Sequence, residues 1–308
     1  SYDCWAEEQK ENRCANWAAH TAHCVCPSAE LLPSIISPLF LSDSRGQLGL
    51  GKVKTDTNSP QHLRSLSAIP LVQVAAGGEQ SFALSVSGGV FGWGRNDRGQ
   101  LGLGDTRGEG SSLSFSPSLI STLSQVACGS QHSVALTKDG QVYTWGQDSR
   151  GQLGLGKVKT DTNSPQHLRS LSAIPLVQVA AGGEQSFALS VSGGVFGWGR
   201  NDRGQLDRQT PTPVHYLNKR KTIHISCGTD HTAVLTKDGA VFTFGSGQYG
   251  QLGHNSFRDG LRPRLVAELW GAKVTKIACG RYSTVLKLMI TNYTETFQLV
   301  PGAVSAMI

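Results

Sequence analysis

The 308-residue sequence has little of what marks a membrane protein or a nucleic-acid-binding protein. Its apolar stretch at residues 31–41 is too short to cross a bilayer and contains Pro33 and Pro38. Charged residues make up only 16% of the chain, and the net charge of +6 is scattered apart from short basic groups such as residues 219–221. We therefore expect no membrane span and interpret the basic residues as solvated loop charge, with a patch for nucleic acid or for an acidic partner as the alternative.

Catalytic patterns are also missing. The sequence has no Ser/His/Asp or Cys/His arrangement and no paired carboxylates at a catalytic spacing. The glycine-rich residues 102–104 lack the Lys and Ser/Thr that a phosphate-binding loop requires. We therefore predict that this chain is not an enzyme and that it binds no cofactor.

One group of residues resembles a metal site. It lies within residues 1–42, outside the repeats described below, and consists of Cys4, Cys14, His20, His23, Cys24 and Cys26. No pair has the C-x2-C spacing of common zinc sites. We expect no metal there and interpret residues 1–42 as an irregular N-terminal segment.

What the sequence does contain is a repeat of about fifty residues. A glycine recurs with steps of 52, 53, 46 and 52 residues, at Gly77, Gly129, Gly182, Gly228 and Gly280. A Trp-Gly or Phe-Gly pair and a Gly-Gln-Leu element recur with the same spacing, including the short step of 46. A single unit is therefore repeated, and one copy has lost part of a loop.

Within one unit the residues favour short strands. Residues 72–75, 82–86 and 90–93 are apolar or alternating, and a two-residue turn separates the last two segments. In other copies this turn is Asp139-Gly140 or Asp238-Gly239, which is typical of a β-hairpin. No helical periodicity is present in the repeats. We predict an all-β propeller whose blades have four antiparallel strands each.

The repeats divide the chain into about five blade equivalents. They are a half unit at 43–71, units at 72–124, 125–176, 177–221 and 222–273, and a half unit at 274–286. We expect residues 287–308 to be an unrelated tail, because Lys287 takes a position that is Leu in the other copies. Residues 43–101 are identical to residues 148–206, which indicates either a recent duplication or an error in assembling the sequence.

The repeated residues have predicted structural roles. Cys128, Cys227 and Cys279 alternate with Ala in other copies, which indicates small buried side chains and favours a reducing compartment. His132 and its counterpart His231 alternate with Gln or Ser, which indicates a loop hydrogen bond. In Gly-Gln-Leu we expect the Leu to fill the space between blades and the Gln side chain to bind the neighbouring backbone.

Partner-binding residues are expected where the copies differ. The position two residues after the recurring glycine varies between copies and holds Glu79, Gln131, Glu184, Asp230 and Tyr282. We predict that these residues contact a protein partner, with ordinary turn residues as the alternative interpretation.

The segment from Val126 to Gly154, with V-x-C-G-x-x-H-S-x-A-L, W-G and G-Q-L-G, resembles the regulator of chromosome condensation repeat. That resemblance covers residues 43–286 and implies a propeller, which has seven blades in the family. Residues 69–78 and 225–235 are most similar to the propellers of small HERC-type ubiquitin ligases, which also carry a catalytic HECT domain. We see neither that domain nor its catalytic cysteine in this chain.

The resemblance implies two functions. The first is a non-catalytic module that recruits protein partners or ubiquitylation substrates for a HERC-like ubiquitin ligase. The alternative is nucleotide exchange on, or chromatin-associated regulation of, a Ran-type small GTPase. We expect a cytoplasmic location, with the nucleus as the alternative.

Overall fold

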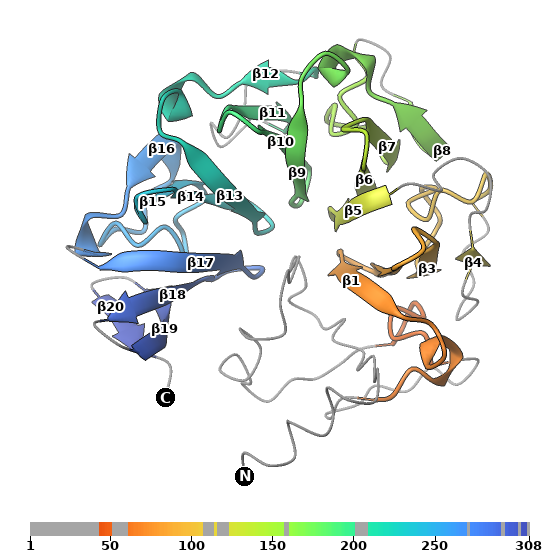
Figure 1. Ribbon diagram of the computed structural model, residues 1–308, viewed down its shortest axis with the longest axis horizontal. Coiled ribbons are helices and arrows are strands. Elements are labelled where there is room, and N and C mark those ends of the chain that lie inside the picture. Colours follow the sequence, from red (N-terminus) through yellow and green to blue (C-terminus); the bar gives the residue numbers. More distant parts are fainter. Residues whose placement is uncertain are drawn as a thin grey trace.

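The computed structural model describes residues 43–50, 61–106, 114–115, 123–156, 160–200, 209–269, 272–290, 293–300 and 303–306. Within these residues the regular structure is strand, apart from short 3-10 helices. Twenty strands form five four-stranded sheets, each built from four consecutive antiparallel strands. The sheets are arranged around a common centre (Figure 1). The predicted all-β propeller with four-stranded blades is confirmed.

The bounds of the elements repeat from blade to blade. Blade one contains β1 (Leu71–Ala76), β2 (Gln80–Ser85), β3 (Val90–Gly94) and β4 (Ser114–Phe115). Blade two contains β5 (Leu123–Cys128), β6 (His132–Thr137), β7 (Val142–Gly146) and β8 (Thr162–His167). Blade three contains β9 (Leu176–Ala181), β10 (Gln185–Ser190), β11 (Val195–Gly199) and β12 (Thr212–Pro213). Blade four contains β13 (Thr222–Cys227), β14 (His231–Thr236), β15 (Val241–Gly245) and β16 (Gly260–Leu265).

Blade five contains β17 (Lys273–Cys279), β18 (Thr284–Ile290), β19 (Tyr293–Val300) and β20 (Ala303–Ala306). The 3-10 helices are η3 (Arg64–Leu66), η4 (Arg169–Leu171), η5 (His215–Leu217) and η6 (Ala267–Leu269). The first strand of every blade lies nearest the centre and the fourth lies at the rim (Figure 1). The described residues place no sheet between blade five and blade one.

The turn between the second and third strand of a blade is the predicted hairpin. The Ser85 N–H donates to the Gly89 carbonyl at 2.8 Å, and the Gly88 N–H donates to the Ser85 carbonyl at 2.9 Å. Gly88 has a φ of +86°, and Gly140 and Gly239 at the equivalent turns have φ values of +79° and +87°. A side chain is strained in this left-handed region, which explains the recurring glycine.

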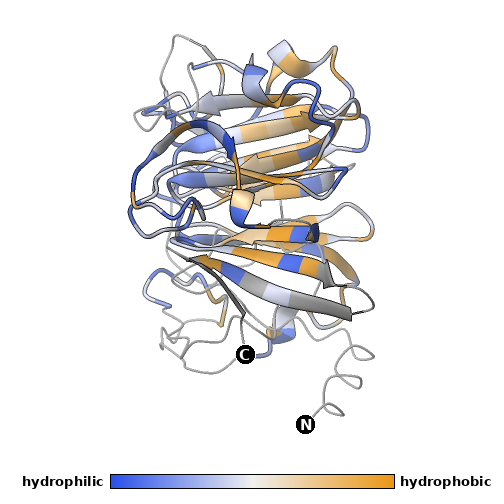
Figure 2. Cartoon of the chain, turned by 90° about the vertical axis from the view of Figure 1, so that its left-hand side faces the viewer, coloured by the Kyte–Doolittle hydropathy of each residue, from blue (hydrophilic) through white to orange (hydrophobic). Residues whose placement is uncertain are grey.

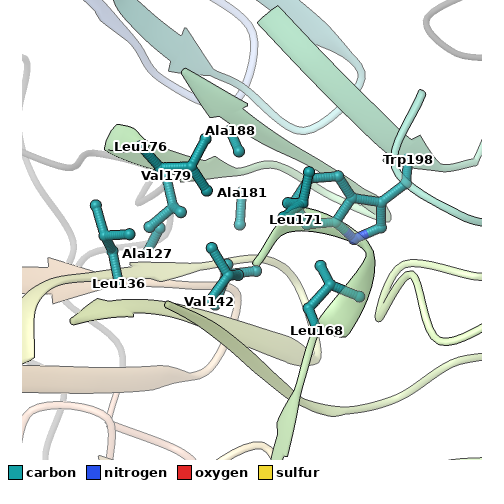
Figure 3. Packing of buried hydrophobic residues seen from close by; sticks show 11 residues of the cluster. Ala127, Leu136, Val142, Leu168, Leu171, Leu176, Val179, Ala181, Ala188 and Trp198 are labelled. Carbon is teal, nitrogen blue, oxygen red and sulfur yellow. The ribbon is translucent and has the colours of Figure 1, made fainter. Parts of the chain in front are cut away.

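The hydrophobic core consists of successive layers between neighbouring blades. Between blades two and three, Leu136 and Val142 face Val179 and Trp198, and all four side chains are buried (Figure 3). Leu171 of η4 packs into the same cluster. Figure 2 shows hydrophobic residues along the strands and hydrophilic residues mainly in the connecting loops. A single blade could not bury both of its faces, so stacking of neighbours stabilises the fold.

Blade five differs from the expected half unit and tail. Strands β18, β19 and β20, at 284–290, 293–300 and 303–306, complete a four-stranded sheet with β17. Lys287 pairs with Lys276, as Leu84 pairs with Gln73 in blade one, so the lysine does not end the strand.

A different residue fills the place of the tryptophan in this blade. The pairing of Val285 with Gln298 puts Leu299 opposite Thr284, the position that Trp93 takes opposite Ser81. Leu299 is 1% exposed and packs into the core, so an aliphatic side chain replaces the aromatic one. The sequence pattern changes in this blade while the backbone pattern persists.

Candidate partner-binding face

Two sets of loops meet at one end of the propeller. Gln80 at the start of β2 pairs with Gly94 at the end of β3, so the loops at 77–79 and 95–106 lie at the same end of blade one. We call this end, with the equivalent loops of the other blades, the loop face. The opposite end carries the hairpins at 86–89 and their equivalents, and we call it the hairpin face.

The recurring glycine lies where neighbouring blades come closest on the loop face. A Cβ on Gly129 would lie 2.6 Å from the Gly182 carbonyl oxygen of the next blade, and Gly77 lies directly against the Gly129 carbonyl. Backbone hydrogen bonds run along the same line, since the Ser130 N–H donates to the Gly183 carbonyl at 2.9 Å. Only a residue without a side chain fits this approach, so the glycines hold the loops of successive blades together.

The Gly-Gln-Leu loops that the structure describes bind the next blade through their main chain. The Trp145 indole N–H donates to the Gln100 carbonyl at 2.8 Å, and the Ser133 hydroxyl donates to the same oxygen at 2.8 Å. Trp93 and Trp198 make the same bond to Gln47 and Gln152, each at 2.9 Å.

The leucine of the loop fills the junction as predicted, because Leu101 packs with Phe82 and Trp145. In the described loops the glutamine side chain does not bind the neighbouring backbone, contrary to the prediction. Its side-chain oxygen accepts from its own loop, as in the 2.9 Å bond from the Arg98 N–H to Gln100 Oε1, and its carbonyl makes the contact with the neighbour.

The histidines after the recurring glycine also connect blades. His132 Nε2 lies 2.8 Å from the Ser186 hydroxyl of the next blade, and His231 Nε2 lies 3.0 Å from the Thr284 hydroxyl. In blade one, Gln80 donates to the Gly129 carbonyl at 3.0 Å instead. A hydrogen-bonding role is confirmed, but the bonds cross the blade junction where a bond within the loop was expected.

The predicted partner-binding residues all lie on the loop face, one in each blade: Glu79, Gln131, Glu184, Asp230 and Tyr282. The first four are half-buried, and Tyr282 is 42% exposed. Each therefore has side-chain atoms at the surface, held on a loop whose backbone is fixed at both ends.

Arginines that the sequence analysis did not single out hold three of these side chains. Arg95 pairs with Glu79 in blade one. Arg200 lies 3.4 Å from both Glu184 of its own blade and Asp230 of the next blade, so it connects the two. The residue after each aromatic-Gly pair differs between copies, as the predicted partner-binding residues do. This variation in the sequence could have located the arginines.

Arg95 also binds a carboxylate of its own loop. Its guanidinium donates to Asp97 at 2.7 Å, and this bond lowers the pKa of the Asp97 carboxyl below its usual value. The loop face of blade one thus carries a fixed arrangement of alternating charges, Glu79, Arg95 and Asp97, before any partner is bound.

The described part of the chain presents neither a metal-binding cluster nor a membrane-spanning helix. No group of three or more His, Cys, Asp or Glu side chains there could hold a metal ion. The cysteine and histidine group at residues 4–26 lies outside the described residues. Among the described helices, none is long and apolar enough to span a bilayer.

A family model for the RCC1-like domain matches residues 40–292, which is most of the chain. The chain belongs to the RCC1-like domain family.

The RCC1-like chain is similar to human probable E3 ubiquitin-protein ligase HERC6. The two are 40% identical over 331 aligned residues, which cover 99% of this chain and 31% of HERC6. The chain thus spans about a third of the length of this relative.

Solved structures agree with the fold. The human WBSCR16 structure has a TM-score of 0.72 and 29% identity, covering 84% of this chain and 70% of that one. The structure of Prp20p from Saccharomyces cerevisiae, described with its binding to Gsp1p and histones, has a TM-score of 0.69 at 23% identity. It covers 78% of this chain and 60% of that one, and it supports the RCC1-like propeller fold alone.

Proposed function

We propose that this RCC1-like propeller is the partner-recruiting part of a HERC-type ubiquitin ligase and takes no part in bond formation itself. The observation that carries the proposal is the 40% identity to HERC6 over 99% of the chain. In such a protein, the loop face holds a substrate while ubiquitin transfer occurs on a separate domain.

The geometry of the loop face supports recognition. Its loops are fixed by hydrogen bonds between blades, such as the one from Trp145 to the Gln100 carbonyl. A partner would therefore bind side chains that are already positioned, which reduces the entropic cost of association. The carboxylates of Glu79, Glu184 and Asp230 and the arginines that hold them present charges of both signs at fixed places, which can orient a partner of complementary charge.

A competition experiment tests the proposal. An excess of this chain is expressed in cells that contain a HERC-type ligase, and ubiquitylated peptides are quantified by mass spectrometry. If the chain recruits substrates, the free propeller competes for them, so ubiquitylation of the proteins that it captures is expected to fall. The E79Q/E184Q/D230N variant is expected to lose both the capture and the competition.

A matched variant controls for nonspecific charge effects. D139N/D238N removes carboxylates from the hairpin face and is expected to compete as the unmodified chain does. Thermal melts of both variants establish that the propeller is folded. Undiminished ubiquitylation of every captured protein in the presence of the free chain would contradict the recruiting role.

Nucleotide exchange on a Ran-type GTPase is the second candidate, favoured by the similarity of fold to Prp20p. It is separated from recruitment by measuring the release of labelled GDP from the GTPase with and without the chain. Acceleration of release would favour exchange over recruitment. For either function we propose a cytoplasmic or nuclear location, where the buried thiols of Cys128, Cys227 and Cys279 stay reduced.

A further inference from the structure

The junction between blades four and five differs from the other junctions on the loop face. At the first junction, Arg45 precedes the Gly-Gln-Leu element and lies 4.0 Å from Glu79 of the following blade. Tyr249 takes the arginine position in blade four, and Tyr282 takes the glutamate position in blade five. The two tyrosine rings are in contact, with centroids 4.4 Å apart and an angle of 43° between their planes. A charged pair is therefore replaced by an aromatic pair at an equivalent place.

This aromatic pair is exposed although it lies at a blade junction. Tyr249 is 55% exposed and Tyr282 is 42% exposed. The guanidinium carbon of Arg281 lies 5.0 Å from the centre of the Tyr282 ring, within the range of a cation–π contact. Tyrosine and arginine are, with tryptophan, enriched among the residues that dominate protein–protein binding energy.

The loop between β15 and β16 extends the same surface. It begins after Gly245 and carries Phe257, which is 63% exposed, followed by the exposed Arg258. The loop is held in place because the Gly247 N–H donates to Asp259 Oδ1 at 3.0 Å and because Gly247 lies directly against the Arg258 carbonyl. We call the set Tyr249, Phe257, Arg258, Arg281 and Tyr282 the tyrosine junction.

The charge of the tyrosine junction is positive. Asp259 accepts from the Gly247 N–H, and Asp230 of the neighbouring loop is paired with Arg200 at 3.4 Å. Within the described part of the chain, neither Arg258 nor Arg281 forms a salt bridge. The nearby carboxylates are thus bound within the fold, while two arginines remain available to a partner.

We propose that the tyrosine junction binds an acidic segment of a protein partner that also presents an aromatic or aliphatic side chain. The arginines would pair with its carboxylates, and the tyrosine rings would cover its apolar side chain. The inference rests on the proposed function and names the class of partner. A protein segment is chosen over a nucleic acid because the proposed function recruits proteins, and binding of RNA is an outcome that the test below distinguishes.

Fluorescence anisotropy with the whole chain tests the inference. The probe is a labelled 15-residue peptide of Glu and Asp with one Phe and one Leu, and the reference probes are the same peptide with Lys for the acids and a 15-nucleotide single-stranded RNA. We expect the acidic peptide alone to bind, and we expect Y249S/Y282S to weaken binding about tenfold or more, as for loss of a dominant contact. R281E is expected to weaken binding of the acidic peptide more than a rise in salt concentration weakens binding to the unmodified chain.

The control variant is Y216S, which removes another exposed tyrosine, in η5 and in contact with Arg262, and is expected to leave the affinity unchanged. Equal loss in the control, or binding of RNA or of the basic peptide as tightly as the acidic one, would overturn the inference. So would the absence of binding by the acidic peptide. If Y249S/Y282S still competes for ubiquitylation substrates as the unmodified chain does, the tyrosine junction is not the recruiting surface, while the proposed function stands.

Discussion

Val74 and Val179 hold the same position in two identical segments, yet Val74 is 38% exposed and Val179 is 0% exposed. Val179 packs against Ala127 and Leu136 of the preceding blade (Figure 3), and its N–H donates to Gln125 Oε1 at 2.8 Å. The described residues place no complete sheet before blade one. The same sequence therefore lies at a covered face in one copy and at an open face in the other.

Because the two valines have the same local sequence, a difference in stability between their variants measures the packing between blades. We expect Val179→Ala to lower the free energy of unfolding by about 2 kcal/mol, because it removes buried methyl groups and leaves a cavity. Val74→Ala is expected to cost less than about 0.5 kcal/mol, since its side chain is largely in water. Urea denaturation of both variants measures the difference, and equal losses would show that Val74 is covered in solution.

A second comparison within the identical segments concerns Ser81 and Ser186. The Ser186 hydroxyl donates to the Gln152 carbonyl at 2.9 Å and lies 2.8 Å from His132 Nε2. The Ser81 hydroxyl donates to the Gln47 carbonyl at 3.0 Å. We expect Ser186→Ala to cost about 1–3 kcal/mol, and more than Ser81→Ala, because it also removes a partner of a buried histidine. Thermal melts measure both, and a larger loss for Ser81→Ala would refute the role of the histidine bond.

A third prediction concerns His224, which takes the place of a glutamine in blade four. The Gln73 side chain donates to the Val126 carbonyl and accepts from the Val126 N–H, both at 2.9 Å. His224 holds the equivalent position, since it pairs with Leu235 as Gln73 pairs with Leu84, and its Nδ1 has no hydrogen-bond partner among the described residues. We expect His224→Gln to restore the two bonds and raise stability by about 1 kcal/mol.

His224 also predicts that the folded protein loses stability in acid. Burial lowers the pKa of His224 from 6.5 to about 4, so the unfolded chain takes up the proton first. The stability from the neutral ring is complete above about pH 6.5 and is lost as the pH falls toward 4. The melting temperature of the unmodified chain should therefore fall faster over this window than that of His224→Gln. Parallel curves for the two proteins would contradict the assignment.

Most of the fold was predictable because buried positions recur at a constant spacing. The tight glycine, the Trp-Gly pair and the hairpin glycine each meet one geometric requirement in every blade, so the sequence repeats them. Blade five was predicted wrongly as a half unit, since Leu299 meets the requirement of the tryptophan with a different side chain and Lys287 interrupts the apolar pattern without ending the strand.

The candidate site was predictable in position but not in its contacts. Variation after the recurring glycine located Glu79, Glu184 and Tyr282 on one face. Their partners come from other loops, as with Arg200 or Tyr249, and a contact between Tyr249 and Tyr282 across 33 residues leaves no local pattern in the sequence. Such pairs follow from the stacking of blades, which only the three-dimensional arrangement provides.

The last prediction concerns the thiols beside the recurring glycines. Cys128, Cys227 and Cys279 are buried thiols that form no disulfide within the described part of the chain, and burial raises the pKa of the Cys279 thiol to about 11. A thiol in this state is rarely ionised near neutral pH and is shielded from reagents, so we expect none of the three to react with iodoacetamide in the folded chain. In 6 M guanidinium chloride all three should be alkylated, and peptide mass mapping resolves them from the cysteines at residues 4–26. Rapid native labelling at Cys128 would show that the junction between blades one and two opens in solution, because that side chain lies in the core cluster with Phe82 and Trp145.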